Sequence, residues 1–340
     1  FGIVVTLAVW NLVDFDKPDL SLFSRFDWYG LFGMAAFLGA LEYVLEEGPL
    51  DDWFEDEVIV VMTVVLVVGA LVFFWRAFTA KEPIVDLTAF KNRNFAFGSL
   101  FSFIMGVGLY GLTYLYPVYL GRIRGYDSLM IGETMFVSGL AMFCTAPIAG
   151  ALSSRMDPRF MMMIGFACFA YGTWIMSSLT TDWDFYELLL PQILRGFGLM
   201  ICMVPINNVA LGTLPPDKIR GASGVFNLTR NLGGAVGLAV INTILTQRQQ
   251  EHYARLSEHV QWGNPAAMDQ LHNMASNYNA HGLDGNTIAI QRMSGLVQQQ
   301  ATTLSFADVF LLLTVLFGTL VLCAFIIKKP QSGVGGGGGH

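Results

Sequence analysis

Eight long apolar runs constrain the fold of this chain more than any other feature of its sequence. Each has about 18 to 27 residues, close to or above the ~20 that a helix needs to cross a bilayer. They fall approximately at 28–45, 58–78, 95–120, 128–152, 160–179, 185–211, 222–246 and 304–327. In hydrocarbon, backbone polar groups must be paired within a helix or a closed barrel, and the alternating ten-residue segments of a barrel are absent. The sequence therefore predicts an all-α integral membrane protein.

Charged residues are too few to cover a soluble protein of this size. They make up 13% of the 340 residues, against about 25% in a typical soluble domain. No basic stripe with interleaved aromatic residues is present, which argues against nucleic-acid binding. The four cysteines lie in apolar runs without CxxC spacing, and neither an HExxH motif nor a nucleophile–base arrangement occurs. We therefore expect lipid around much of the surface, no metal or other cofactor, and no enzymatic activity.

The positions of Lys and Arg between the runs predict the orientation. If residues 1–13 are the end of a helix that finishes in the cytoplasm, twelve of these cations fall on the cytoplasmic side and five outside. The other two, Arg195 and Arg230, lie within runs. This orientation places the acidic stretch Glu46–Glu57 and the polar segment 248–303 outside the membrane.

The runs and the polar segments between them predict six parts. These are the truncated end of a spanning helix at 1–13, a cytoplasmic linker at 14–27, two spanning helices at 28–80, a second cytoplasmic linker at 81–94, a six-helix bundle at 95–329 that carries the outer loop 248–303, and a flexible Gly-rich tail at 330–340. Helix breakers at 263–265 and 282–285 are expected to divide the outer loop into short helical pieces. A loop this long is usually functional or disordered, so it is either a docking surface or a flexible connector.

Ionisable residues deep in a span mark candidate functional positions, because each costs about 2.5–3.5 kcal/mol to insert. Arg195 lies near the predicted midplane, and Arg230 lies about eight residues in from the cytoplasmic side. Each is expected either to face an internal cavity or to form a structural ion pair or carbonyl clamp. Glu133 is shallower, and it either pairs with Arg195, accepts a proton, or sits in interfacial water. Glu42, near the end of its span, is expected at the interface.

The run from Gly221 to Gly237 combines polar and small residues in one helix. Asn227, Asn231 and Gly234 recur at a spacing that puts them on one helical face. Gly233 and Gly237 form a small-xxx-small pair that allows a neighbouring helix to approach closely. This pattern suits a moving interface between helices.

Two other spans contain several glycines and prolines and are expected to be interrupted. One contains Gly106, Gly108, Gly111 and Pro117, and the other contains Pro191, Gly196, Gly198 and Pro205, followed by Asn207 and Asn208. They lead the two sets of three spans in the last six, and matching interruptions point to a midplane site between inverted repeats. Tyr110 and Tyr114 share a face and either line an apolar cavity or serve generic packing.

Several motifs resemble one transporter family. They are Leu41-Glu-Tyr-Val-Leu-Glu-Glu-Gly48 with Asp52-Trp53-Phe54, Pro83-Ile-Val-Asp-Leu87, Phe90-Lys-Asn-Arg-Asn-Phe95, and Leu214-Pro-Pro-Asp217 before the helix with Asn227-Leu-Thr-Arg230 and Gly233-Gly234. Together they resemble the EmrB/QacA-type drug:proton antiporters, the fourteen-helix branch of the major facilitator superfamily. The resemblance covers essentially the whole chain.

This resemblance implies a fold and a function. Residues 1–13 would end the sixth helix, 28–78 would be the two extra helices, and 95–327 the C-terminal six-helix bundle. The family resides in the bacterial inner membrane and exports hydrophobic or amphipathic drugs against protons by alternating access. In Gram-negative bacteria it works with a periplasmic adaptor (membrane fusion protein) and an outer-membrane channel, and the outer loop is the expected adaptor contact.

The resemblance also suggests roles for individual residues. The loop 150–159 looks like a degenerate second copy of the superfamily's gating loop, since it keeps Gly150, Arg155 and Arg159 but not the usual core. The expected cavity wall consists of Tyr110, Tyr114, Arg195, Asn207, Asn208, Asn227, Arg230 and Asn231. Gly233, Gly234 and Gly237 are expected to serve helix packing, and Glu133 is the candidate protonatable group. The alternative function is a non-transporting membrane scaffold or sensor that binds a partner through the outer loop.

Overall fold

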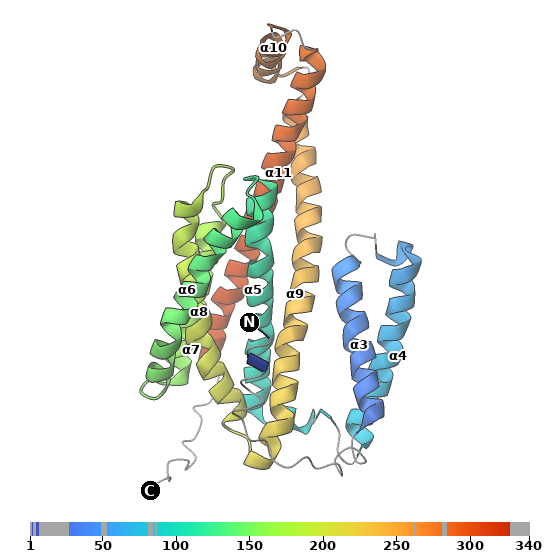
Figure 1. The fold of residues 1–340 in the computed structure, drawn as a ribbon, viewed down its shortest axis with the longest axis vertical. Helices are drawn as coiled ribbons and strands as arrows, with labels where there is room; N and C mark the ends of the chain where they lie inside the picture. Colours follow the sequence, from blue (N-terminus) through green and yellow to red (C-terminus); the bar gives the residue numbers. More distant parts are fainter. Residues whose placement is uncertain are drawn as a thin grey trace.

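The computed structural model is built from helices (Figure 1). It describes Gly2, Val5, Thr6 and residues 27–48, 53–80, 84–85, 87–260, 263–280 and 284–326. The helices are α3 (Trp28–Glu47), α4 (Glu57–Thr79), α5 (Arg93–Arg122), α6 (Ser128–Ser153), α7 (Pro158–Met176), α8 (Phe185–Leu211), α9 (Pro216–His259), α10 (Pro265–Ala280) and α11 (Gly285–Cys323), with short 3₁₀ turns η1 (Trp53–Glu55), η2 (Leu87–Lys91) and η3 (Ala324–Ile326).

Eight of these helices are long and apolar enough to cross a membrane, namely all except α10. The prediction of an all-α membrane protein with eight spans is therefore confirmed. The predicted linker 14–27 (except Asp27), the tail 330–340 and most of the predicted helix end at 1–13 lie outside the described residues.

Short polar side chains fix where most spans begin. The N-cap residue accepts hydrogen bonds from backbone N–H groups of the first turn in seven helices, and each such cap stabilises a helix by about 1 kcal/mol. The caps are Asp27 for α3, Asp56 for α4, Asn92 for α5, Asp127 for α6, Asp157 for α7, Asp184 for α8 and Asp284 for α11. At α8 the cap is reciprocal, because the Glu187 carboxylate accepts from the Asp184 backbone N–H. Aspartates between apolar runs therefore act as helix start signals.

The bundle consists of α5 to α9 and α11, and α3 and α4 form a separate hairpin beside α9 (Figure 1). Within the bundle α5 packs mainly on α9, and α7 packs on α8 and α11. Aromatic side chains fill its centre, such as Phe169 against Phe317 at 4.8 Å between ring centroids. In the hairpin, the buried Asp27 carboxylate pairs with Arg76 Nε at 2.8 Å and so joins the start of α3 to the end of α4.

The expectation of two interrupted spans is wrong, because α5 and α8 are continuous helices with their prolines inside. Their glycines lie instead where another helix comes close. A Cβ at Gly98 would meet Ala210, and one at Gly198 would meet the Gly165 carbonyl oxygen at 2.8 Å. Glycine here provides close helix contact rather than a break, as small residues do in membrane bundles.

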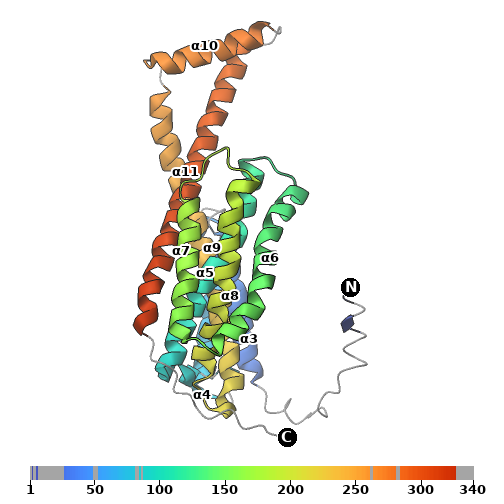
Figure 2. The ribbon, with the colours of Figure 1, turned by 90° about the vertical axis from the view of Figure 1, so that its left-hand side faces the viewer.

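The outer segment is more regular than expected. Its breakers bound α10, but the flanking residues are not short separate pieces, since α9 continues to His259 and α11 begins at Gly285 (Figures 1 and 2). We call residues 247–259, α10 and residues 285–303 the stalk. At about 1.5 Å per residue its two long arms extend roughly 20 and 28 Å beyond the apolar runs. Figure 2 shows α10 lying across the end of these two arms.

Candidate functional site

The contact between α5 and α9 depends on glycines from both helices. A Cβ at Gly233 would overlap the Phe103 carbonyl oxygen, and one at Gly106 would overlap the Arg230 carbonyl oxygen. Gly234 lies against the Tyr110 ring, and Gly237 would place a Cβ 2.9 Å from the Val107 Cα. Three glycines that the sequence assigned to helix packing therefore lie in one seam, and its partner helix is α5.

Pairs of hydrogen-bonded polar side chains follow this seam. The Tyr110 hydroxyl donates to Asn231 Oδ1 at 3.3 Å, and Arg230 Nη2 donates to Asn227 Oδ1 at 2.7 Å. Asn227 and Asn231 are one turn apart on α9, and both are exposed. Arg230 Nη1 also lies 3.9 Å from the Met203 sulfur of α8. The described chain thus brings Arg230 and two of the predicted asparagines together.

Polar side chains continue along α5 to the second deep arginine. Thr113 is exposed and lies one turn beyond Tyr110, and its hydroxyl accepts a hydrogen bond from Arg195 Nη2 of α8. The Arg195 side chain is buried, with its guanidinium 5.6 Å from the centroid of the Tyr116 ring. We define the polar row as Asn227, Arg230, Asn231, Tyr110, Thr113 and Arg195. Arg195 itself lies in the α5–α8 contact and lines none of the described pockets.

A pocket of about 280 Å³ opens beside the polar row, between the hairpin helix α3 and helices α5 and α9. Its polar lining comes from Tyr110, Asn231, Glu42 and Glu46, and its apolar lining consists of Leu38, Leu41, Leu228, Leu232, Ala235 and Leu238. Glu42 therefore borders a pocket between helices. The combination of a mostly apolar wall with a few polar groups is typical of small-molecule sites.

The remaining predicted cavity residues lie apart from this pocket. Tyr114 is half-buried against the hydrophobic core. Asn207 is half-buried one turn after Met203, whereas Asn208 is exposed. Glu133 is exposed on α6 and forms no ion pair with Arg195 within the described residues.

The predicted gating residues surround the turn between α6 and α7. Gly150 lies in α6, and a Cβ there would meet nothing within 4 Å. Arg155 is exposed, and Arg159 is half-buried in the first turn of α7 with its backbone N–H bonded to Asp157. Gly150 therefore makes no close helix contact with the described chain, in contrast to Gly233 and Gly237.

A polar anchor ties together the ends of the bundle helices that lie on the side of the stalk. Arg124 Nη1 donates to the Thr181 carbonyl oxygen at 3.1 Å, and the Tyr126 hydroxyl donates to the Asp184 carboxylate. The hydrogen bonds from Tyr126 and from the Phe185 backbone N–H lower the pKa of Asp184. This carboxylate therefore stays charged at neutral pH, and the anchor weakens only as acid protonates it.

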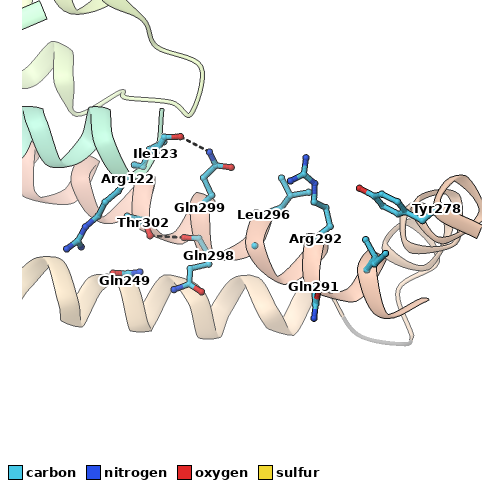
Figure 3. Close-up of a pocket in the computed structure, with 12 residues that line it drawn as sticks. Arg122, Ile123, Gln249, Tyr278, Gln291, Arg292, Leu296, Gln298, Gln299 and Thr302 are labelled. Atoms are coloured by element: carbon cyan, nitrogen blue, oxygen red, sulfur yellow. Dashed lines mark hydrogen bonds between the residues drawn. The ribbon is translucent and has the colours of Figure 1, made fainter. Parts of the chain in front are cut away.

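The stalk carries a groove of about 760 Å³ (Figure 3). Figure 3 shows it running along α11 from Tyr278 of α10 to Arg122 at the end of α5, with Gln299 Nε2 bonded to the Ile123 carbonyl oxygen at 3.0 Å. Its lining contains two arginines, Arg122 and Arg292, and no acidic residue. At the base of the stalk, His252 Nε2 lies 2.9 Å from the Asp308 carboxylate and so links α9 to α11.

Sequence reasoning missed four residues of this site. Thr113 and Tyr116 hold Arg195, and Glu42 and Glu46 line the pocket from α3. Thr113 had a usable signal, since it lies three residues after Tyr110 and thus near it on the same face. No sequence signal identified α3 as a neighbour of α9. Among the described residues, no group of three or more His, Cys, Asp or Glu side chains could hold a metal ion.

The family profile and the most similar known proteins all indicate the same family. The profile of the Major Facilitator Superfamily matches residues 20–238. The colistin resistance protein EmrB of Acinetobacter baumannii is 37% identical over 331 residues, covering 97% of this chain and 65% of that protein. The multidrug export protein EmrB of Escherichia coli K12 is 31% identical, covering 93% of this chain and 60% of its own length. The fatty acid resistance protein FarB of Neisseria gonorrhoeae is 28% identical, covering 100% of this chain and 65% of that protein.

The chain therefore spans 60–65% of the length of these curated relatives. The eight apolar helices and the sequence similarity point to the same kind of multi-pass membrane protein. The chain belongs to the major facilitator superfamily, and it is similar in sequence to the EmrB colistin resistance and multidrug export proteins.

Proposed function

We propose that the full-length protein exports hydrophobic or amphipathic compounds across the bacterial inner membrane by proton antiport and alternating access. The observation that carries this proposal is the polar row between α5, α8 and α9, which contains Arg195 and Arg230 and borders a mostly apolar pocket through Tyr110 and Asn231. The relatives' names, which cite colistin, multidrug and fatty acid resistance, support amphipathic substrates of varied chemistry.

In this proposal the polar row, together with Tyr114, Asn207 and Asn208, forms one wall of the transport cavity. The part of the full-length protein that this chain does not span would supply the opposite wall. Because the α5–α9 seam is lined by glycine, the two helices can pack closely without interlocking large side chains. Gly150, Arg155 and Arg159 are proposed to act in cytoplasmic gating, and Glu133 is proposed as a protonatable group.

The polar row is tested by removing its α9 members. In the full-length protein at normal expression, Asn227→Ala and Arg230→Ala should each reduce drug efflux by about tenfold, because each removes the partner of a charge-assisted hydrogen bond. Efflux is measured as accumulation of a fluorescent drug in energised cells. Thr319→Ala, which alters an exposed hydroxyl of α11 outside the row, is the control. Unchanged drug resistance in both variants would rule out this face as part of the cavity.

The stalk is proposed to contact a periplasmic adaptor, which would connect the transporter to an outer-membrane channel. Its long helical arms and the 760 Å³ groove with two arginines support a docking role over a flexible connector. The rival function, a membrane scaffold or sensor, also requires the stalk but requires no transport.

Replacing residues 250–300 with a short Gly-Ser linker separates these two functions. For an exporter with an adaptor, we expect drug resistance of cells to be lost while the purified full-length protein still moves drug into proteoliposomes. The reason is that the replacement leaves the polar row in place. If neither the native nor the replaced protein transports any drug, the scaffold function is favoured.

A further inference from the structure

Arg195 is a buried cation with too few hydrogen-bond and ionic partners among the described residues of this chain. The residue is 7% exposed and lies about ten residues into α8. Nη2 donates to the Thr113 hydroxyl and the guanidinium faces the Tyr116 ring. Within the described residues, Nη1 is buried without a hydrogen-bond partner, and no carboxylate forms an ion pair with Arg195. The nearby buried Gln192 Oε1 also lacks a partner there.

An arginine in this position is strongly stabilised by an anion. A charge taken out of water without a counter-charge costs several kcal/mol, and a phenol ring and one hydroxyl offset only part of that. The planar guanidinium matches a carboxylate, which accepts two parallel N–H bonds. Glu133, the acid that the sequence offered as a partner, is exposed and unpaired with Arg195.

We propose that Arg195, positioned by Thr113, binds the carboxylate of an amphipathic compound during export. This inference rests on the proposed export function and names one substrate class for it. Thr113 is exposed, and Tyr110 one turn away is 40% exposed, so a ligand on the polar row reaches the Thr113 hydroxyl to which Arg195 donates. Its apolar body would lie along α5 toward α9.

The charges around α5 fix the direction in which such a ligand lies. Glu42 and Glu46 line the pocket on the α3 side and repel a second carboxylate there. Arg195 lies on the α8 side of α5. The anionic end of the ligand therefore faces α8, and its apolar end faces the leucines of the pocket.

The carboxylate could instead be a side chain of the same protein outside the described residues, and a matched pair of probes distinguishes the two sources. Full-length protein in lipid nanodiscs is titrated with 1-pyrenebutyrate and with its neutral analogue 1-pyrenebutanol, following pyrene fluorescence. Arg195→Met should weaken pyrenebutyrate binding by about tenfold or more and leave pyrenebutanol binding within about twofold. Arg195→Lys keeps the charge but lacks the planar guanidinium that donates two parallel hydrogen bonds. It should weaken pyrenebutyrate binding about threefold. Lys91→Met removes an exposed cation of the 3₁₀ turn η2, away from the polar row, and should change neither affinity.

Three outcomes would overturn the proposal. Native protein that binds the two probes equally has no carboxylate subsite. Arg195→Met that weakens both probes alike, or neither, assigns Arg195 to a structural pair with a protein carboxylate. Export of a neutral drug is measured separately on the same variants, so absence of all export contradicts the proposed function and leaves the binding result to decide the subsite.

Discussion

Replacing Gly233 with valine should prevent the full-length protein from forming a stable bundle. The added Cβ would overlap the carbonyl oxygen of Phe103, which is backbone and cannot rotate away. The contact is equally close from the α5 side, because a Cβ at Gly106 would overlap the Arg230 carbonyl oxygen. Overpacking typically costs about 1–3 kcal/mol, and here two backbones must separate, so we expect a loss of at least about 3 kcal/mol.

The matched control is Gly139→Val in α6, where a Cβ would meet nothing within 4 Å. Both substitutions place the same β-branched residue within a spanning helix, so helix propensity changes equally. Fluorescence-detected size-exclusion chromatography after a temperature series measures how much folded full-length protein remains. A Gly233→Val protein that elutes and melts like the Gly139→Val protein would show that the seam is not tightly packed.

The spans were predictable because their determinants are local. Run length and apolar composition decide whether a helix can cross a bilayer, and both are properties of consecutive residues. Contacts between spans depend on distant residues instead. Arg195 is held by Thr113, 82 residues earlier, and Gly233 meets Phe103 on another helix. A single sequence indicates that Gly233 allows another helix to approach closely, but it does not identify that helix.

The two errors about helix continuity have one cause. Glycine and proline were taken as breaks in α5 and α8, where the membrane leaves the backbone no alternative to helical hydrogen bonding. Conversely, the change from apolar to polar residues was taken as the end of α9, although no glycine or proline occurs between Gly237 and Gly263. Polarity marks where a helix leaves lipid, whereas helix breakers outside the lipid mark where it ends.

Removing the carboxylate of Asp27 should loosen the α3–α4 hairpin more than removing both members of its ion pair. Asp27→Leu removes the carboxylate that lies 2.8 Å from Arg76 and leaves this arginine partly buried without its ionic partner. It also removes the α3 cap, so we expect the hairpin to lose about 3 kcal/mol of stability. In the double variant Asp27→Leu/Arg76→Met no unpaired charge remains, and the loss should fall to about 1 kcal/mol, the cost of the cap.

Hydrogen exchange of residues 28–79 in the full-length protein measures this difference, with Glu55→Gln in the 3₁₀ turn at the other end of the hairpin as a control. Faster exchange in the single variant than in the double variant is the expected order. The order matters for function, because α3 supplies Glu42, Glu46 and two leucines to the pocket beside the polar row. A hairpin held by a charge pair at its inner end fixes that wall of the pocket. If the double variant exchanges as fast as Asp27→Leu, the cap alone holds the hairpin and the ion pair contributes nothing.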